Sequence, residues 1–340
     1  MKVFYCLVYM GFIIFSTGCK NENTPSSIVT DILVGGTEKN GGKSIAKYWK
    51  NGVPVILSDG TRDAVVLSVA ASGNDVYAAG YAVAYNSLFF VAKYWKNGVP
   101  VILSDSTRDA AVISIVISGI DVYAAGYENN SSYIGIAKYW KNGMPVNLTN
   151  GLNRAAVRSL VVNGADVYAA GYEQNSTGKS VAKYWKNGVA VNLTDGTQNA
   201  IVYSIVVNGA DIYAAGSEQN STGKPIAKYW KNGTAVPLSD GTQNAVAYSI
   251  AINGGDVYAA GFEYINAGTT IAKYWKNGTA VPLSDGTKNA EIYSIAINGT
   301  DVYMSGTDGL TAKYWKNSTP INLLGSVNGA SAYSIFVYTH

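Results

Sequence analysis

Apolar and β-branched residues fill short stretches of this chain, and Gly, Asn and Asp separate the stretches. One unit, starting at Ala200, reads AIVYSIVVNG, ADIYAAGSE, QNSTGKP, IAKYWKNG and TAVPLSDGTQN. All pieces except the polar QNSTGKP have the composition of strands bounded by turn residues. No stretch after the first 18 residues shows a sustained apolar period of 3.6 residues. The pattern predicts an all-β protein with four antiparallel strands per unit.

The unit occurs seven times. Every tryptophan lies in one motif, AKYWKN, and successive copies are 46, 45, 45, 45, 45 and 40 residues apart: Trp49, Trp95, Trp140, Trp185, Trp230, Trp275 and Trp315. Six of the copies continue into Asn-Gly, which favours a type I′ hairpin because both residues tolerate positive φ. Four strands in about 45 residues is the period of a propeller blade.

The two ends of the repeat array complement each other. The domain begins with a second strand, DILVGG from Asp31, and ends with a first strand, AYSIFVYTH. We therefore predict a seven-bladed β-propeller over 31–340, whose C-terminal strand joins the three N-terminal strands and closes the ring. An open array of sheets is the alternative, but it leaves strand edges exposed at both ends. The order of strands and turns resembles propellers of the NHL and WD40 type. Their Gly-His and Trp-Asp signatures are absent, so no binding residue is carried over.

The N-terminus has the pattern of an export signal. Lys2 precedes an apolar run of about 13 residues, too short to span a membrane, and small residues lead to Cys19. This segment resembles the lipobox of bacterial lipoproteins, which implies cleavage after residue 18 and lipidation of Cys19. Plain secretion is the alternative. We expect a signal peptide at 1–18, a lipid-anchored polar tether at 19–30, and an outer-membrane or cell-surface location, with membrane contact only through the lipid.

Composition narrows the chemistry. A net charge of +3 over 340 residues is too weak for a nucleic-acid footprint. The single histidine is His340 and the two cysteines are Cys6 and Cys19, so Ser-His and Cys-His catalysis and His-based metal sites are not expected. We predict no cofactor, no metal and no enzymatic activity. A carboxylate-dependent hydrolase is a distant alternative.

The repeated residues favour packing roles. Adjacent Tyr and Trp in KYWK point to opposite faces of a strand, and both faces of a blade are covered by neighbours. An acid after the second strand should form an exposed ion pair with the lysine that enters the third strand. The second repeat has Ala82 at this acidic position. It continues as AVAYNSLFF, in which Phe90 is expected at the aliphatic position before AKYW, with a hydrophobic contact patch as the alternative.

Residues that differ between copies are the candidates for binding an asymmetric ligand. The position before the serine of the first strand differs between repeats, and the predicted ligand-binding residues occupy it: Arg158, Tyr203, Tyr248, Tyr293 and Tyr333. They should cluster near the mouth of the central channel, although packing against the next blade explains them equally well. The polar loops on the same face are a second candidate surface. The sequence therefore predicts a monomeric recognition module whose partner is an envelope protein or, alternatively, a glycan.

Overall fold

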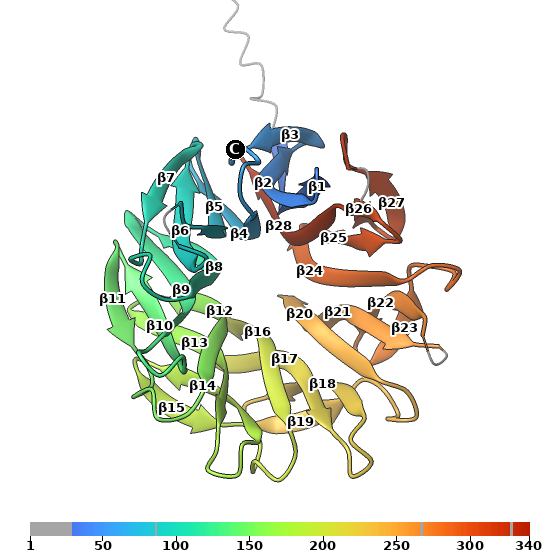
Figure 1. Ribbon diagram of the computed structural model, residues 1–340. Coiled ribbons are helices and arrows are strands. Elements are labelled where there is room, and N and C mark those ends of the chain that lie inside the picture. The colour runs from blue at the N-terminus through green and yellow to red at the C-terminus, as the bar shows by residue number, and fades with distance from the viewer. Residues whose placement is uncertain (1–28, 86, 266–267, 327–328) are drawn as a thin grey trace, which may run out of the picture.

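The chain forms a ring of seven four-stranded antiparallel sheets, seen down the axis in Figure 1. The computed structural model describes residues 29–85, 87–265, 268–326 and 329–340, and every regular element in them is a strand. No helix able to span a membrane occurs among these residues. The predicted signal peptide 1–18, Cys19 and most of the tether 19–30 lie outside them. The predicted all-β, seven-bladed propeller is confirmed.

Each blade has the same order of strands from the axis outward (Figure 1). The innermost strands are β28 (Ser331–Thr339), β4 (Ala64–Ser72), β8 (Ala110–Ser118), β12 (Ala155–Asn163), β16 (Ala200–Asn208), β20 (Ala245–Asn253) and β24 (Ala290–Asn298). The second strands are β1 (Thr30–Asn40), β5 (Asp75–Val83), β9 (Asp121–Asn129), β13 (Asp166–Gln174), β17 (Asp211–Gln219), β21 (Asp256–Tyr264) and β25 (Asp301–Asp308).

The outer half of each blade consists of the aromatic strand and a short edge strand. The third strands are β2 (Lys43–Lys50), β6 (Phe90–Lys96), β10 (Gly135–Lys141), β14 (Ser180–Lys186), β18 (Pro225–Lys231), β22 (Thr270–Lys276) and β26 (Thr311–Lys316). The fourth are β3 (Val53–Ile56), β7 (Val99–Ile102), β11 (Met144–Asn147), β15 (Val189–Asn192), β19 (Thr234–Pro237), β23 (Thr279–Pro282) and β27 (Thr319–Asn322). Blade 1 is β28 with β1–β3, and blades 2 to 7 follow in chain order from β4.

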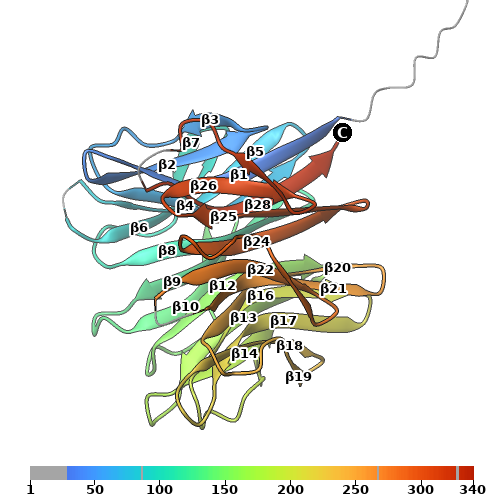
Figure 2. The same cartoon turned by 90° about the vertical axis from the view of Figure 1, so that its right-hand side faces the viewer.

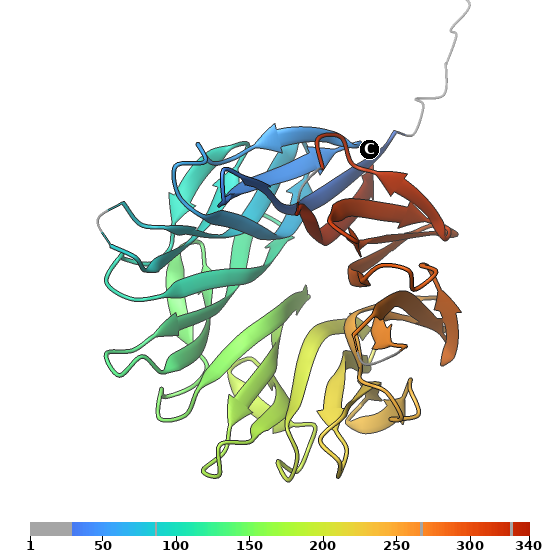
Figure 3. The same cartoon turned by 45° about the vertical axis from the view of Figure 1, so that its right-hand side comes forward.

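The ring closes as predicted from the unmatched strands at the two ends of the repeat array. β28 pairs antiparallel with β1, with Val34 opposite Ile335, so blade 1 is built from both ends of the chain. Val29 and His340 exchange two backbone hydrogen bonds, of 3.1 and 3.0 Å. Figure 2 shows the C-terminus beside the start of β1, and in Figure 3 the dark red terminal strand lies against the blue N-terminal blade.

Hydrophobic cores lie between blades. Between blades 3 and 4, for example, Tyr123 and Ala137 of one blade pack with Leu160 and Trp185 of the next. All seven tryptophans are buried, with at most 3% of each side chain exposed. This burial confirms the predicted packing role, and truncating a buried tryptophan to alanine typically costs about 3–5 kcal/mol.

Serine side chains join neighbouring blades near the axis. The Oγ of Ser114 in β8 accepts a hydrogen bond of 3.1 Å from the N–H of Leu160 in β12. Equivalent bonds occur at five other junctions, accepted by Ser68, Ser159, Ser204, Ser249 and Ser334. The serine recurs because, at these six junctions, one innermost strand satisfies a backbone donor of the next.

Candidate functional site

The predicted binding residues occupy a structural irregularity that the repeat imposes on every blade. In β12, Val157 pairs with Gly171 and Ser159 pairs with Ala170, so Arg158 is inserted as a β-bulge. The same register shift occurs in the other six innermost strands, and the inserted residues are Leu67, Ile113, Tyr203, Tyr248, Tyr293 and Tyr333. A bulge redirects a side chain away from the regular alternation of the strand. The variable position of the repeat is therefore the bulged one.

A glycine in the second strand makes each bulge possible. A Cβ on Gly171 would lie 2.0 Å from the carbonyl oxygen of Ala156, and the corresponding separation at the other six blades is 1.9–2.0 Å. These contacts are to backbone, so no side-chain movement relieves them. The last residue of the VYAAG motif is glycine because the bulged strand passes too close for any side chain.

The four predicted tyrosines form one continuous aromatic series, here called the tyrosine arc. The ring centroids of Tyr203 and Tyr248 are 5.0 Å apart, those of Tyr248 and Tyr293 are 5.6 Å apart, and those of Tyr293 and Tyr333 are 5.2 Å apart. The first pair meets edge to face, at 84°. Burial raises the pKa of Tyr203, Tyr248 and Tyr293, so these phenols are neutral at physiological pH. The arc covers blades 5, 6, 7 and 1, while the aliphatic Leu67 and Ile113 occupy the same position in blades 2 and 3.

Arg158 stands next to the arc, on blade 4. Its guanidinium carbon lies 5.8 Å from the ring centroid of Tyr172. Its Nε is buried and has no hydrogen-bond partner among the described residues. A buried donor without a partner is costly, and an ordered water, an ion or a ligand would satisfy it.

Sequence reasoning missed Glu291. It lies two residues before Tyr293 in β24 and is the only acidic residue in the seven innermost strands, as Arg158 is the only basic one. Burial raises the pKa of its carboxyl group. The signal was present in the sequence, because every other repeat has an aliphatic or small residue at this position.

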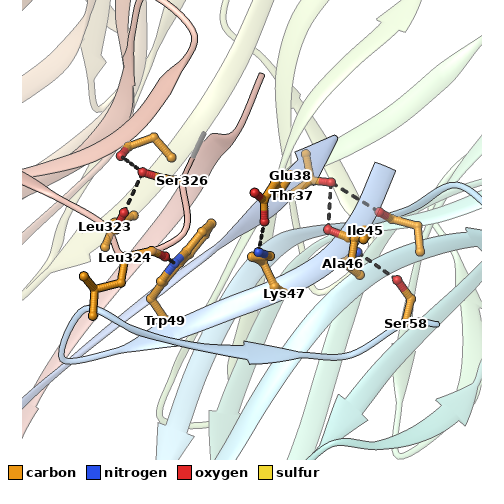
Figure 4. A network of polar contacts seen from close by, with 12 residues as sticks. Thr37, Glu38, Ile45, Ala46, Lys47, Trp49, Ser58, Leu323, Leu324 and Ser326 are labelled. Carbon is orange, nitrogen blue, oxygen red and sulfur yellow. Dashed lines mark hydrogen bonds and ion pairs between the residues drawn. The ribbon is translucent and has the colours of Figure 1, made fainter. Parts of the chain in front are cut away.

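The predicted ion pairs at the loop face form in six blades. Lys183 lies 2.6 Å from Glu173, and Figure 4 shows the equivalent contact of Lys47 with Glu38. The remaining pairs are Lys138–Glu128, Lys228–Glu218, Lys273–Glu263 and Lys313–Asp308. The expectation that these pairs are exposed is wrong, because only 5–19% of each lysine side chain is accessible.

The loop-face amides are engaged within their own blades, and the expected position of Phe90 is wrong. Asn130 uses its side chain within its own loop and on the carbonyl of Gly151, and Asn175 and Asn220 do the same in their blades, so these amides are not free to adapt to a ligand. In blade 2, Val91 and not Phe90 holds the aliphatic position, because Val91 pairs with Ala82. Phe90 instead packs on Tyr81, with centroids 4.6 Å apart.

The aspartates of the LSDGT turns accept hydrogen bonds from the threonine two residues later in the same turn. Asp195, for example, accepts hydrogen bonds of 2.9 and 2.8 Å from the N–H and hydroxyl of Thr197. In the described part of the chain, no group of three or more His, Cys, Asp or Glu residues is arranged to hold a metal ion. The arrangement around the axis offers instead one cation, neutral phenols and one half-buried carboxyl group, which suits recognition of a polar ligand.

Comparison with known proteins identifies the fold and no family. No family model matches the sequence, and no curated protein matches it. Among solved structures, the chain is similar to a puromycin-hydrolyzing peptidase from Mycobacterium tuberculosis (TM-score 0.53, 10% identity, 87% of this chain and 54% of that one). It is also similar to an acylaminoacyl peptidase from Pyrococcus horikoshii (0.52, 11%, 87% and 51%).

A third similar structure is the β-propeller domain of the Trilobed protease from Pyrococcus furiosus (TM-score 0.52, 8% identity, 88% of this chain and 95% of that one), described as having an open velcro topology. In contrast, β28 closes the present ring. The chain spans about half the length of the two peptidases. At these identities the likeness extends to the fold alone.

The prediction that the protein is not an enzyme is contradicted by these comparisons. All three similar chains are peptidases or part of a protease. The prediction rested on the lack of a complete set of catalytic groups within a single propeller. In the two longer proteins, about half of the chain lies outside the matched region. The residue content of a propeller is therefore no ground for excluding an enzymatic role.

Proposed function

We propose that this propeller is a recognition domain that binds an acidic peptide segment of a protein partner around the tyrosine arc, with a carboxylate held by Arg158. The observation that carries the proposal is the Arg158 guanidinium, whose buried Nε has no partner among the described residues. A carboxylate accepts two parallel hydrogen bonds from such a group. The neighbouring phenols then supply hydroxyl donors and acceptors along the bound segment.

The ring geometry favours a peptide over a glycan. Sugars bind to aromatic residues through open ring faces, whereas Tyr203 and Tyr248 meet edge to face at 84° and cover part of each other. The similar chains are named as peptidases or a protease, which makes peptides the first class to test. A glycan carrying a carboxylate is the alternative ligand of the same arginine.

The test compares two arginines of one blade. Binding of the purified protein to arrays of acidic peptides and of glycans identifies the ligand, and fluorescence polarisation measures its affinity. Arg158→Gln should weaken binding at least tenfold, which corresponds to about 1.4 kcal/mol. Arg154→Gln removes the same charge from an exposed position four residues away and should change affinity less than twofold. Equal effects of the two variants would show that Arg158 contributes only general charge.

We further propose that the propeller is attached to a bacterial envelope through a lipid on Cys19. The support is the apolar run before Cys19 and the polar segment after it. Cys19→Ala should move the protein from the membrane fraction to the soluble fraction of the cells that produce it. Cys6→Ala is the matched control and should leave the distribution unchanged. Membrane retention of the Cys19 variant would contradict the proposal.

A further inference from the structure

Blade 2 departs from the repeat at one pair of positions. In the six other blades, an acid at the end of the second strand meets a lysine of the third strand. Ala82 occupies the acidic position in blade 2, since Ala64 pairs with Ala82 as Ala110 pairs with Glu128. The lysine is still there, as Lys93.

Among the described residues, Lys93 therefore has no counterion. It forms no ion pair or hydrogen bond with any residue in the described ranges, whereas the other six lysines at this position each contact a carboxylate. It is half-buried, and its ammonium lies 5.9 Å from the ring centroid of Trp95. Burial lowers the pKa of Lys93. A partly desolvated cation of this kind gains from any anion that reaches it.

The missing side chain leaves room for such an anion. A pocket of about 680 Å³ opens at this place, lined by both Ala82 and Lys93. Trp95, Pro100 and Ile102 form an apolar wall. The volume lies in the range of small-molecule sites, and the wall suits a hydrocarbon or aromatic body.

The other charged residues that line the pocket already have hydrogen-bond partners; they are Asp59, Arg62 and Asp105. Arg62 donates a hydrogen bond of 2.7 Å to the carbonyl of Tyr85, whose hydroxyl donates to Asp59 at 2.9 Å. Asp59 and Asp105 are exposed and hold Thr61 and Thr107 in turns. Lys93 is thus the cation of the pocket that has no hydrogen-bond partner among the described residues, and the carboxylates stand where solvent screens them.

We propose that the blade 2 pocket binds a carboxylate attached to an apolar body, and that the carboxylate pairs with Lys93 in place of the acidic side chain present in the other six blades. The body lies along Trp95, Pro100 and Ile102. The carboxylate belongs either to a small organic acid or to the C-terminus of a peptide, and both present the same chemistry to Lys93. This site is independent of the tyrosine arc and shares no residue with it.

The chain provides its own test variant. Ala82→Glu restores the acid that six blades already have, so it is compatible with the fold, and it fills the pocket with a tethered carboxylate. Titration calorimetry with 3-phenylpropionate should show binding to the full-length protein and at least a tenfold loss in Ala82→Glu. Arg158→Gln should leave this affinity within twofold, which separates this site from the tyrosine arc.

Matched ligands identify the source of the carboxylate. 3-Phenylpropionamide has the same body without the charge and should bind at least tenfold more weakly than the acid. A short peptide ending in phenylalanine is compared with its amidated form: tighter binding of the free peptide than of 3-phenylpropionate assigns the site to a chain terminus, and the reverse order assigns it to a small acid. Undiminished binding of the acid by Ala82→Glu, equal binding of acid and amide, or no binding of either carboxylate at millimolar concentration would overturn the proposal.

Discussion

Single residues decide where the candidate site lies. The glycine opposite each bulge permits the innermost strand to insert one residue, and the inserted residue is free to differ from blade to blade. This arrangement keeps Arg158 next to the tyrosine arc, although the surrounding strands are nearly identical in sequence. The same glycine position thus serves the packing of every blade and the variety of side chains around the axis.

Gly171→Ala tests this dependence. The added Cβ would lie 2.0 Å from a carbonyl oxygen of the bulged strand, so the strand must shift. We expect a loss of about 3 kcal/mol, at the upper end for overpacking, because backbone must move. Gly255→Ala is the control, since its Cβ meets nothing within 4 Å. Thermal melting should show a clear drop for the first variant and almost none for the second. Equal melting temperatures would mean that the bulge is dispensable.

At the scale of elements, an ion pair and two side-chain hydrogen bonds, together called the lock, hold the Asn-Gly hairpin. Asn187 and Gly188 have positive φ, 50° and 86°, as the sequence predicts for a type I′ turn. Asn187 also donates 2.7 Å to Asp166 and accepts a bond of 2.9 Å from the N–H of Val167. Lys186 lies 2.8 Å from the same Asp166. This Asp–Lys–Asn arrangement recurs in all seven blades, and sequence reasoning missed it because the aspartate is 15 to 22 residues from its partners in the sequence.

The lock predicts a dependence of stability on pH. The Lys186 ammonium and the Asn187 amide hold the pKa of Asp166 below its ordinary value of 3.8. Its stabilising effect is therefore complete above that value and is lost as pH falls through the lowered pKa of the folded state. Asp166→Asn keeps the acceptor for Asn187 but removes the charge, so its melting temperature should fall less than that of the wild type between pH 5 and pH 2. A parallel fall in both proteins would show that the ion pair does not stabilise the fold.

For the whole molecule, counting strands was enough to predict the architecture. Seven tryptophans at a nearly constant spacing set the number of blades, and the unmatched strands at the two ends predicted the closure of blade 1. The site was only partly predictable. Arg158 and the tyrosines differ between repeats and were found for that reason, whereas their bulged geometry depends on pairing between strands. The pocket beside Lys93 was missed because it arises where Ala82 replaces the acidic side chain of the other blades. Its volume also depends on how two blades pack.

Closure of the ring makes the stability of blades 1, 2 and 7 depend on the last strand. Without residues 331–340, blade 1 loses the strand that pairs with β1, and blade 2 loses the Ser334 hydroxyl that accepts the N–H of Val69. The exposed edge of β1 is then a template for pairing with another chain. A chain ending at residue 330 should melt at least 10 °C lower and self-associate, as measured by calorimetry and light scattering.

A peptide of residues 331–340 turns this truncation into a test of the closure itself. Added to the shortened chain, it should occupy the place of β28, restore most of the melting temperature and suppress self-association. The same peptide with Ile335→Asp should fail, because Ile335 is 5% exposed and lies in the core between blades 7 and 1 with Val34 and Trp49. Equal rescue by both peptides would mean that backbone pairing alone closes the ring. A shortened chain that stays monomeric and melts like the full-length protein would show that the ring is stable while open.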